Sequence, residues 1–245
     1  MSRFSVTYIG GPTAVLEYAG MRIITDPTFD EPQTYADPGS TPLVKTRGPG
    51  IALADLGIID LVLLSHHEHP DNLDIAGATL LTGTVLSTPE AASDLSQVTG
   101  LAPWEQARVG HVTVTAVPAL HGPVGSEPFV GTVTGFVLQC EEEPTVYVSG
   151  DNASLDCVRS IAAQFPAIDY AVLFAGAARV PAIDAPLTLT SMDAVEAARI
   201  LGAGQVVGLH TEDWEHFSES RAQLEAAFAG SGLLAITPRG VRVDL

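Results

Sequence analysis

The most constraining feature of this sequence is a set of short apolar runs, four of which are followed closely by a histidine or an aspartate. The run from Asp60 to Leu64 is apolar after its first residue, which is typical of a strand buried on both faces. Residues just past the carboxyl end of such a strand lie at the edge of a sheet and face a crevice. The pattern therefore predicts a sheet protein with polar side chains gathered at one edge.

The segment that follows this run is the richest in metal-binding residue types. It reads Ser65-His66-His67-Glu68-His69-Pro70-Asp71-Asn72-Leu73-Asp74. Imidazole and carboxylate together are the ligands that zinc, iron and manganese take in proteins. The plain alternative is an exposed polar turn, or a helix start capped by Asp71. Three histidines and two aspartates at one strand end favour a metal site.

Three further strand ends repeat this arrangement. His121, Asp151 and His210 each stand just past an apolar run. Taken singly, the two histidines could equally be structural, and Asp151 would more often cap the helix expected to begin near Ala153. Because parallel strands end on the same side of a sheet, these side chains are expected to meet the first segment in space.

The rest of the chain predicts strands alternating with helices, without a linker or a break in composition. Strands are expected over 4–9, 14–18, 21–25, 60–64, 84–87, 112–117, 132–139, 145–148, 170–174, 205–209, 233–237 and 241–243, and helices over 89–98, 153–165, 191–201 and 218–228. A Pro- and Gly-rich segment from 28 to about 50 has no period and is expected to be a functional or mobile loop. This order predicts one domain, residues 1–245, in which helices pack on two sheets.

Charge and composition exclude several functions. The 245 residues include 11 basic and 29 acidic side chains, a net charge of −18, and 46% of the chain is hydrophobic. Binding to nucleic acid or to an anionic membrane needs clustered basic residues, and Lys45 is the only lysine. Two cysteines make no disulfide framework, so a reduced, cytoplasmic protein is expected. The expected partner is a small-molecule substrate, with no nucleic acid and no membrane.

Taken in order, these pieces resemble the metallo-β-lactamase superfamily of hydrolases, and most of all its branch of L-ascorbate 6-phosphate lactonase-like proteins. The matching pieces, which span most of the chain from Phe4 to Phe217, are Thr25-Asp26-Pro27, the His/Asp segment, Val117-Pro118 before His121, Ser149-Gly150-Asp151 and the late His210. The resemblance implies an α+β fold, a four-layer αββα sandwich with metal ions at one edge of the sheets. Since relatives in that branch often form oligomers, it also raises a homo-oligomer without fixing one.

The resemblance also implies a set of metal ligands. One metal ion would be held by a loop histidine (His66 or His67), His69 and His121, and a second by Asp71 and His210, with Asp151 bridging. The spacing to His69 selects His67 as the loop ligand, whereas the position after Ser65 selects His66, with one extra residue forming a bulge. Both alternatives stay open at this point.

One position departs from the family pattern. The family loop normally runs His-x-His-x-Asp-His, and its last position is Asn72 in this chain. An amide ligates metal poorly compared with imidazole. The expectation is therefore one tightly bound ion and one weakly bound ion, or a single ion.

The expected activity is hydrolysis of a small-molecule lactone, ester, amide or phosphodiester. Zinc, or alternatively manganese or iron, held by three protein ligands keeps a position for water and lowers its pKa toward about 7, so that hydroxide is available as nucleophile. Asp71 and His210 are the expected catalytic residues, with Asp71 orienting the water or taking its proton.

Two other functions are compatible with the sequence. A di-iron oxidoreductase on the same fold would normally carry a flavin domain, for which this length leaves no room. A non-enzymatic sensor or scaffold with a decayed site is favoured by Asn72 alone.

Residues around the site also receive expected roles. Trp214, His216 and Phe217 follow the last ligand and are expected to line the pocket. Asp26 is expected to orient a ligand histidine. Arg47 and Arg179 are the candidate anchors for an anionic group.

Overall fold

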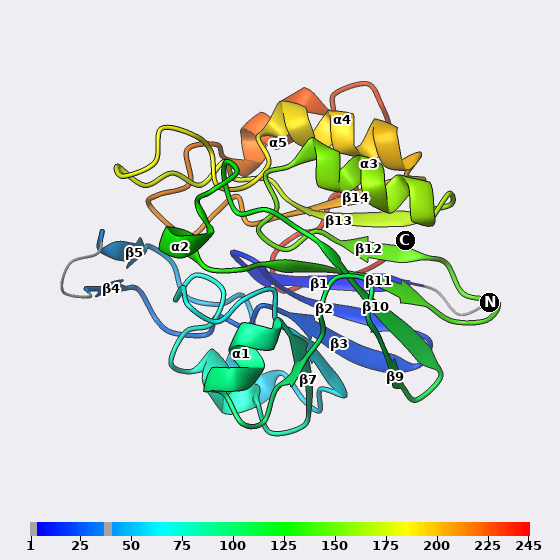
Figure 1. Cartoon of the computed structure of the whole chain (residues 1–245), viewed down its shortest axis with the longest axis horizontal. Helices are drawn as coiled ribbons and strands as arrows, with labels where there is room; N and C mark the ends of the chain where they lie inside the picture. The colour runs from blue at the N-terminus through cyan, green and yellow to red at the C-terminus, as the bar shows by residue number, and fades with distance from the viewer. Residues whose placement is uncertain (1–3, 37–40) are drawn as a thin grey trace.

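Two β-sheets packed face to face form the centre of the molecule (Figure 1). A computed structural model describes residues 4–36 and 41–245. The first sheet has the strand order β15-β1-β2-β3-β6-β7-β8, and the second has the order β14-β13-β12-β11-β10-β9. A separate two-stranded sheet pairs β4 with β5.

The elements have the following bounds. The strands are β1 (Ser5–Gly10), β2 (Thr13–Tyr18), β3 (Met21–Thr25), β4 (Gln33–Tyr35), β5 (Leu43–Lys45), β6 (Leu61–Leu63), β7 (Thr84–Ser87), β8 (Thr99–Gly100), β9 (Gln106–Val109), β10 (Val112–Pro118), β11 (Thr134–Gln139), β12 (Val146–Val148), β13 (Tyr170–Phe174), β14 (Gln205–Leu209) and β15 (Arg242–Asp244). The helices are α1 (Pro89–Asp94), α2 (Glu127–Val130), α3 (Leu155–Gln164), α4 (Ser191–Leu201) and α5 (Arg221–Ala227), with 3₁₀ turns at Leu53–Asp55 and Gly77–Leu80.

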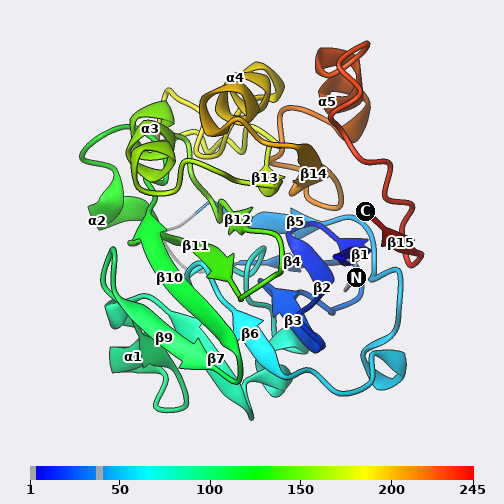
Figure 2. The same cartoon turned by 90° about the vertical axis from the view of Figure 1, so that its right-hand side faces the viewer.

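Alternation along each strand divides the apolar side chains among three cores. Phe136 and Leu138 face the core between the two sheets, whereas Val137 between them faces the helices. Helices α3, α4 and α5 cover the outer face of the second sheet, and α1 with the 3₁₀ turn after residue 76 covers the first (Figure 2). The four-layer αββα sandwich expected from the sequence is therefore confirmed.

The strand directions explain why distant polar residues gather at one edge. Strand β10 runs antiparallel to β11, and β11 runs antiparallel to β12, so β10 and β12 point the same way. Strands β13 and β14 continue in parallel with β12. In the first sheet, β6 lies parallel to β3 and β7. The carboxyl ends of β10, β12 and β14 thus lie at one edge of the second sheet.

Two expectations from the sequence were wrong in detail. The segment expected to be a loop from 28 to about 50 contains the β4–β5 hairpin, although its residues 37–40 lie outside the described residues. The hairpin is held by Lys45, whose buried ammonium lies 2.8 Å from Asp74 Oδ2. The strand expected over 233–237 is reduced to a single β-bridge between Leu234 and Val206 of β14. Beyond this bridge the chain leaves β14 for the first sheet, where the backbone N–H of Gly240 donates to the Tyr8 carbonyl on β1.

Helix boundaries moved by a few residues for reasons of capping. Helix α3 begins after Ser154, whose side chain accepts from the backbone N–H of Cys157. Asp151 therefore does not cap this helix and is left for another role. No helix in the described ranges combines the length and the apolar character that a membrane crossing requires.

Candidate metal centre

Six side chains from four strand ends form two adjacent groups. The first group is His66, His69 and His121, and the second is Asp71, Asp151 and His210. Within each group the candidate ligand atoms all lie within 4.8 Å of one another. The structure thus brings together the residues that the sequence placed after β6, β10, β12 and β14.

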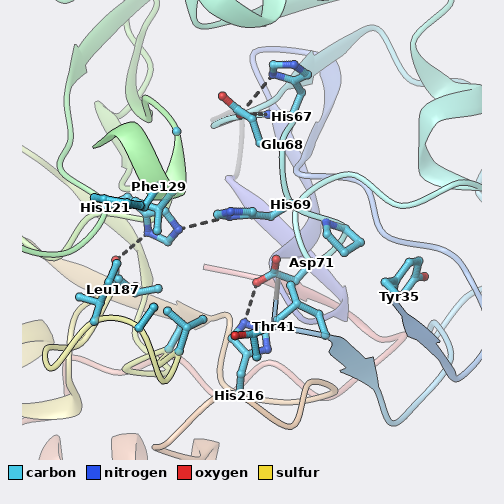
Figure 3. A pocket seen from close by; sticks show the side chains of 18 of the residues that line it. Tyr35, Thr41, His67, Glu68, His69, Asp71, His121, Phe129, Leu187 and His216 are labelled. Atoms are coloured by element: carbon cyan, nitrogen blue, oxygen red, sulfur yellow. Dashed lines mark hydrogen bonds and ion pairs between the residues drawn. The ribbon is translucent and has the colours of Figure 1, made fainter. Parts of the chain in front are cut away.

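The first group consists of three imidazoles that face one another. His66 Nε2 lies 2.9 Å from His69 Nδ1, and His121 Nε2 lies 3.4 Å from the same nitrogen. The other ring nitrogens of two of these residues have outer partners: His66 Nδ1 lies 3.1 Å from Ser65 Oγ, and His121 Nδ1 lies 2.8 Å from the Leu187 carbonyl (Figure 3). Such outer hydrogen bonds fix the tautomer and the ring orientation of metal-binding histidines.

Burial favours the neutral imidazole in two of these residues, His66 and His121. Desolvation, together with the neighbouring His69 and His121, holds the pKa of His66 well below its usual value. Burial, with a further contribution from His69, lowers the pKa of His121 to about 3. Neutral imidazole is the form that binds a metal, so His66 and His121 are in the binding form at neutral pH.

The second group contains carboxylates as well as imidazole. His210 Nε2 lies 3.2 Å from Asp71 Oδ2 and 3.4 Å from Asp151 Oδ1. The other oxygen of Asp151 lies 3.8 Å from His121 Nε2 in the first group. Asp151 therefore stands between the two groups, with one oxygen toward each.

The residues of this edge fit a divalent cation. Asp71 Oδ1 and Asp151 Oδ2 are buried and have no hydrogen-bond partner within the described part of the chain. A buried polar atom left unpaired costs about 1–3 kcal/mol, and native structures rarely tolerate several together. Nitrogen and carboxylate donors in this combination suit zinc, manganese or iron.

The carboxyl groups differ in their protonation. Burial alone would raise the pKa of Asp71, but the imidazoles of His216 and His210 hold it well below its usual value. Burial and then the negative charges of Asp71 and Asp26 raise the pKa of Asp151 well above its usual value. Burial also raises the pKa of Asp26 to about 8, despite hydrogen bonds from Ser65 that lower it. A cation would offset the cost of ionising these buried groups.

The structure separates the two adjacent loop histidines. His66 is fully buried in the first group. His67 turns outward, with its Nε2 3.0 Å from Asp94 Oδ2 and its Nδ1 3.2 Å from Glu68 Oε2. His67 therefore lies outside both groups, and the extra residue between Ser65 and His69 is accommodated by this outward turn.

Residues beside the six complete the description. Asn72 Nδ2 donates to Ser65 Oγ at 3.3 Å and to Asp151 Oδ1 at 3.2 Å. Asp26 Oδ1 accepts from the backbone N–H of Ser65 at 2.7 Å, so it fixes the backbone before His66. The Leu187 carbonyl had no signal in the sequence, because any residue offers the same backbone group.

The aromatic segment after β14 is placed differently from the expectation. His216 lines the cavity, with its Nε2 3.0 Å from Asp71 Oδ2 (Figure 3). Trp214 is buried and packs behind His216, with ring centroids 6.2 Å apart. Phe217 packs against the His210 ring at a centroid distance of 4.1 Å. Trp214 and Phe217 therefore support the site from behind rather than line the cavity.

A cavity of ≈ 950 Å³ opens over both groups. Much of its wall is apolar, with Leu43, Phe129, Val130, Val180, Ile183 and Leu187 among the lining residues. Its ionisable lining consists of histidines, Tyr35 and the acidic Glu68, Asp71 and Glu127. No lysine or arginine of the described chain lines it, so Arg47 and Arg179 do not act as anchors in this wall.

Comparisons with known proteins agree with this architecture. Residues 21–211 match the beta-lactamase superfamily domain. A UPF0173 metal-dependent hydrolase of Rubrobacter xylanophilus is 29% identical over 218 residues, which cover 84% of this chain and 80% of that protein.

Solved structures extend the similarity to nearly the whole chain. A possible metal-dependent hydrolase of Veillonella parvula has a TM-score of 0.87 at 18% identity, covering 99% of this chain and 100% of that one. An isothiocyanate hydrolase from Delia radicum gut bacteria has a TM-score of 0.84 at 23% identity, covering 98% of each chain. At these identities the likeness is one of fold.

Proposed function

The chain belongs to the beta-lactamase superfamily, and on that premise we propose that it is a metal-dependent hydrolase of a small, uncharged molecule with an apolar body. The observation that supports this proposal is the pair of buried ligand groups in the wall of one cavity, with Asp151 between them. Closer placement in the branch of lactonase-like proteins stays a prediction.

In this proposal the first ion position is formed by His66, His69 and His121, and the second by Asp71, Asp151 and His210. A divalent ion held by these residues would supply a water of lowered pKa, toward about 7, and a positive charge for an electrophilic oxygen. Zinc is the proposed metal because imidazole nitrogen and carboxylate oxygen are its usual donors, and manganese and iron are the alternatives.

The protein side chains contribute orientation and charge. Asp71 has a pKa well below its usual value, so it is ionised at neutral pH and can accept a hydrogen bond from an attacking water. So low a pKa makes Asp71 a poor proton acceptor, and its proposed role is to orient that water. His216 Nε2 forms a hydrogen bond with Asp71 Oδ2 at 3.0 Å, and His210 Nε2 lies 3.2 Å from the same oxygen.

The composition of the cavity wall supports the proposed class of substrate. An anionic group would find acidic Glu68 and Glu127 in the wall, with no described lysine or arginine to offset its charge. An apolar body can instead pack on Phe129, Val180 and Ile183. Among the substrates that the chemistry allows, lactones, esters and amides are therefore favoured over phosphodiesters.

The test is metal reconstitution on a substrate panel. Protein stripped with a chelator is supplied with Zn²⁺, Mn²⁺ or Fe²⁺ and assayed on an aryl ester, a lactone, an anilide, benzyl isothiocyanate and bis(p-nitrophenyl) phosphate. The isothiocyanate is included because one structural neighbour is named for that substrate. We expect added metal to restore turnover of at least one uncharged substrate, and we expect the phosphodiester to be hydrolysed more slowly than that substrate.

Other outcomes would assign other functions. A flat response to every metal and every substrate would favour a non-enzymatic protein. An absorption band seen with iron alone, without hydrolysis, would favour a di-iron oxidoreductase. Phe129→Ala, which removes an exposed aromatic ring of the cavity wall, should raise KM for the apolar substrate with little change in kcat.

A further inference from the structure

We propose that His216 is a fourth protein ligand of the second metal position, beside Asp71, Asp151 and His210. His216 Nε2 lies 3.0 Å from Asp71 Oδ2, and His210 Nε2 lies 3.2 Å from the same oxygen. Two imidazole nitrogens from one loop thus converge on a single carboxylate oxygen. This inference rests on the metal dependence proposed above. It adds His216 as a ligand to the second group, which so far consists of Asp71, Asp151 and His210.

The loop that carries His216 is fixed by its neighbours on both sides. The His216 carbonyl accepts from the backbone N–H of Arg179 at 2.9 Å. The preceding residue, Glu215, donates its backbone N–H to Val44 of strand β5 at 3.1 Å. The β4–β5 hairpin therefore has a function in this proposal, since it holds the loop against the site.

The ring of His216 is also held in place by packing. The Phe217 ring meets it edge to face at a centroid distance of 4.7 Å, and the Trp214 ring does so at 6.2 Å. The side chain is 12% exposed. Metal ligands need this kind of support, because a loosely held imidazole loses conformational freedom when it binds.

Asn72 acts on the same group in a different way. Its amide nitrogen donates to Asp151 Oδ1 and to Ser65 Oγ, so it orients a carboxylate of the second group. With His216 included, the second position has two imidazoles and two carboxylates, the number of ligands in a tetrahedral zinc site. The proposal therefore replaces the weak second site expected from Asn72 with a second site that binds tightly.

The experiment measures metal binding directly, without an assay of activity. Full-length protein is stripped with a chelator and titrated with Zn²⁺ against a competing chromophoric chelator, and metal content is checked by elemental analysis after dialysis. The wild type should bind two equivalents. His216→Ala should bind the second equivalent at least about tenfold more weakly, with the first unchanged.

Two further variants separate ligation from other roles. His216→Gln keeps a donor toward Asp71 but ligates metal poorly, so it should bind the second equivalent as weakly as His216→Ala. His67→Ala is the matched control, because His67 contacts Asp94 outside both groups. It should bind both equivalents as the wild type does.

Contrary results have distinct meanings. If either His216→Ala or His216→Gln bound the second equivalent with wild-type affinity, His216 would not be a metal ligand. If this were seen in His216→Gln alone, the role of His216 would be to orient Asp71 by a hydrogen bond. A wild type that binds no metal would overturn the proposed function as well. The melting temperature of each stripped variant, compared with the stripped wild type, shows that a lost equivalent does not come from unfolding.

Discussion

The two ligand groups share one edge of the fold but differ in how burial acts on them. In the first group burial favours neutral imidazoles, as the lowered pKa values of His66 and His121 show. In the second group burial opposes the ionised carboxylate of Asp151, whose pKa is raised. The first group is therefore ready for a cation, whereas the second needs a cation to offset the charge it must carry.

The difference has a consequence for metal loading. Below about pH 8 the stripped protein holds a proton on Asp26, because burial raises the pKa of this carboxyl to about 8. Burial also raises the pKa of Asp151 well above its usual value. Metal entry at the second group should displace a proton from Asp151, because its raised pKa favours the protonated carboxyl. In the first group the lowered pKa values of His66 and His121 favour imidazoles that have no proton to lose. Proton release on loading should thus accompany the second equivalent.

The largest effect is expected for Asp151→Ala, because this substitution removes a carboxylate that lies between the two ligand groups. Asp151 places one oxygen toward His210 and the other toward His121. Its loss should lower kcat/KM by about 10³-fold or more and reduce both metal equivalents, since metal activation contributes several kcal/mol. His69→Ala, by contrast, should affect the first equivalent alone. Full retention of one tight equivalent in Asp151→Ala would restrict Asp151 to a single group.

A pH-dependent effect is expected for Asp26→Asn in the stripped protein. A carboxyl whose folded pKa is raised, here to about 8 by burial, contributes stability that is fully present below about pH 4 and is lost as pH rises through about 8. The variant should therefore gain stability over the wild type as pH rises, by up to about 4 kcal/mol at pH 7.

Urea unfolding of both proteins between pH 4 and pH 8 would measure this difference. The buried histidines act in the opposite direction, because stability from His121 is lost as pH falls from about 6.5 toward about 3. That contribution is the same in both proteins and cancels in the difference. If the free energy of unfolding of the variant and the wild type differed by the same amount at every pH, the pKa of Asp26 would not be raised by folding, and Asp26 would be ionised in the folded protein.

A smaller effect, mainly on the first group, is expected for Ser65→Ala. Ser65 Oγ lies 3.1 Å from His66 Nδ1 and helps to fix that ring. Its removal should weaken binding of the first equivalent by about 10–100-fold, the usual cost of losing such an outer partner. Ser93→Ala on α1, where the hydroxyl donates only to the Pro89 carbonyl, is the control. Equal affinities in the two variants would remove Ser65 from the orientation of His66.

The smallest effect is expected for His67→Ala. The partner of His67, Asp94, is 68% exposed, and ion pairs at such positions contribute about 1 kcal/mol or less. Metal content should stay at the wild-type value, with a small change in the urea midpoint. A lost metal equivalent would instead make His67 the loop ligand in place of His66.

Much of the fold was predictable from local pattern. Apolar runs marked most of the strands, and Thr190 with Asp193 forms a capping box where helix α4 was expected to begin. The β4–β5 hairpin was not predictable, because Gln33–Tyr35 and Leu43–Lys45 have no alternation and depend on the buried pair of Lys45 with Asp74. Local periodicity carries no information about a partner 29 residues away.

The candidate metal site likewise combines features that local pattern predicted with features that it did not predict. The sequence was enough to place His69, Asp71, His121, Asp151 and His210 just past buried strands, because alternation and strand length are local properties. The fold was needed to show that His66 faces inward while His67 faces Asp94, and that His216 contacts Asp71 from 145 residues away. A strand end fixes where a residue lies, whereas the direction of its side chain depends on neighbours supplied by other parts of the chain.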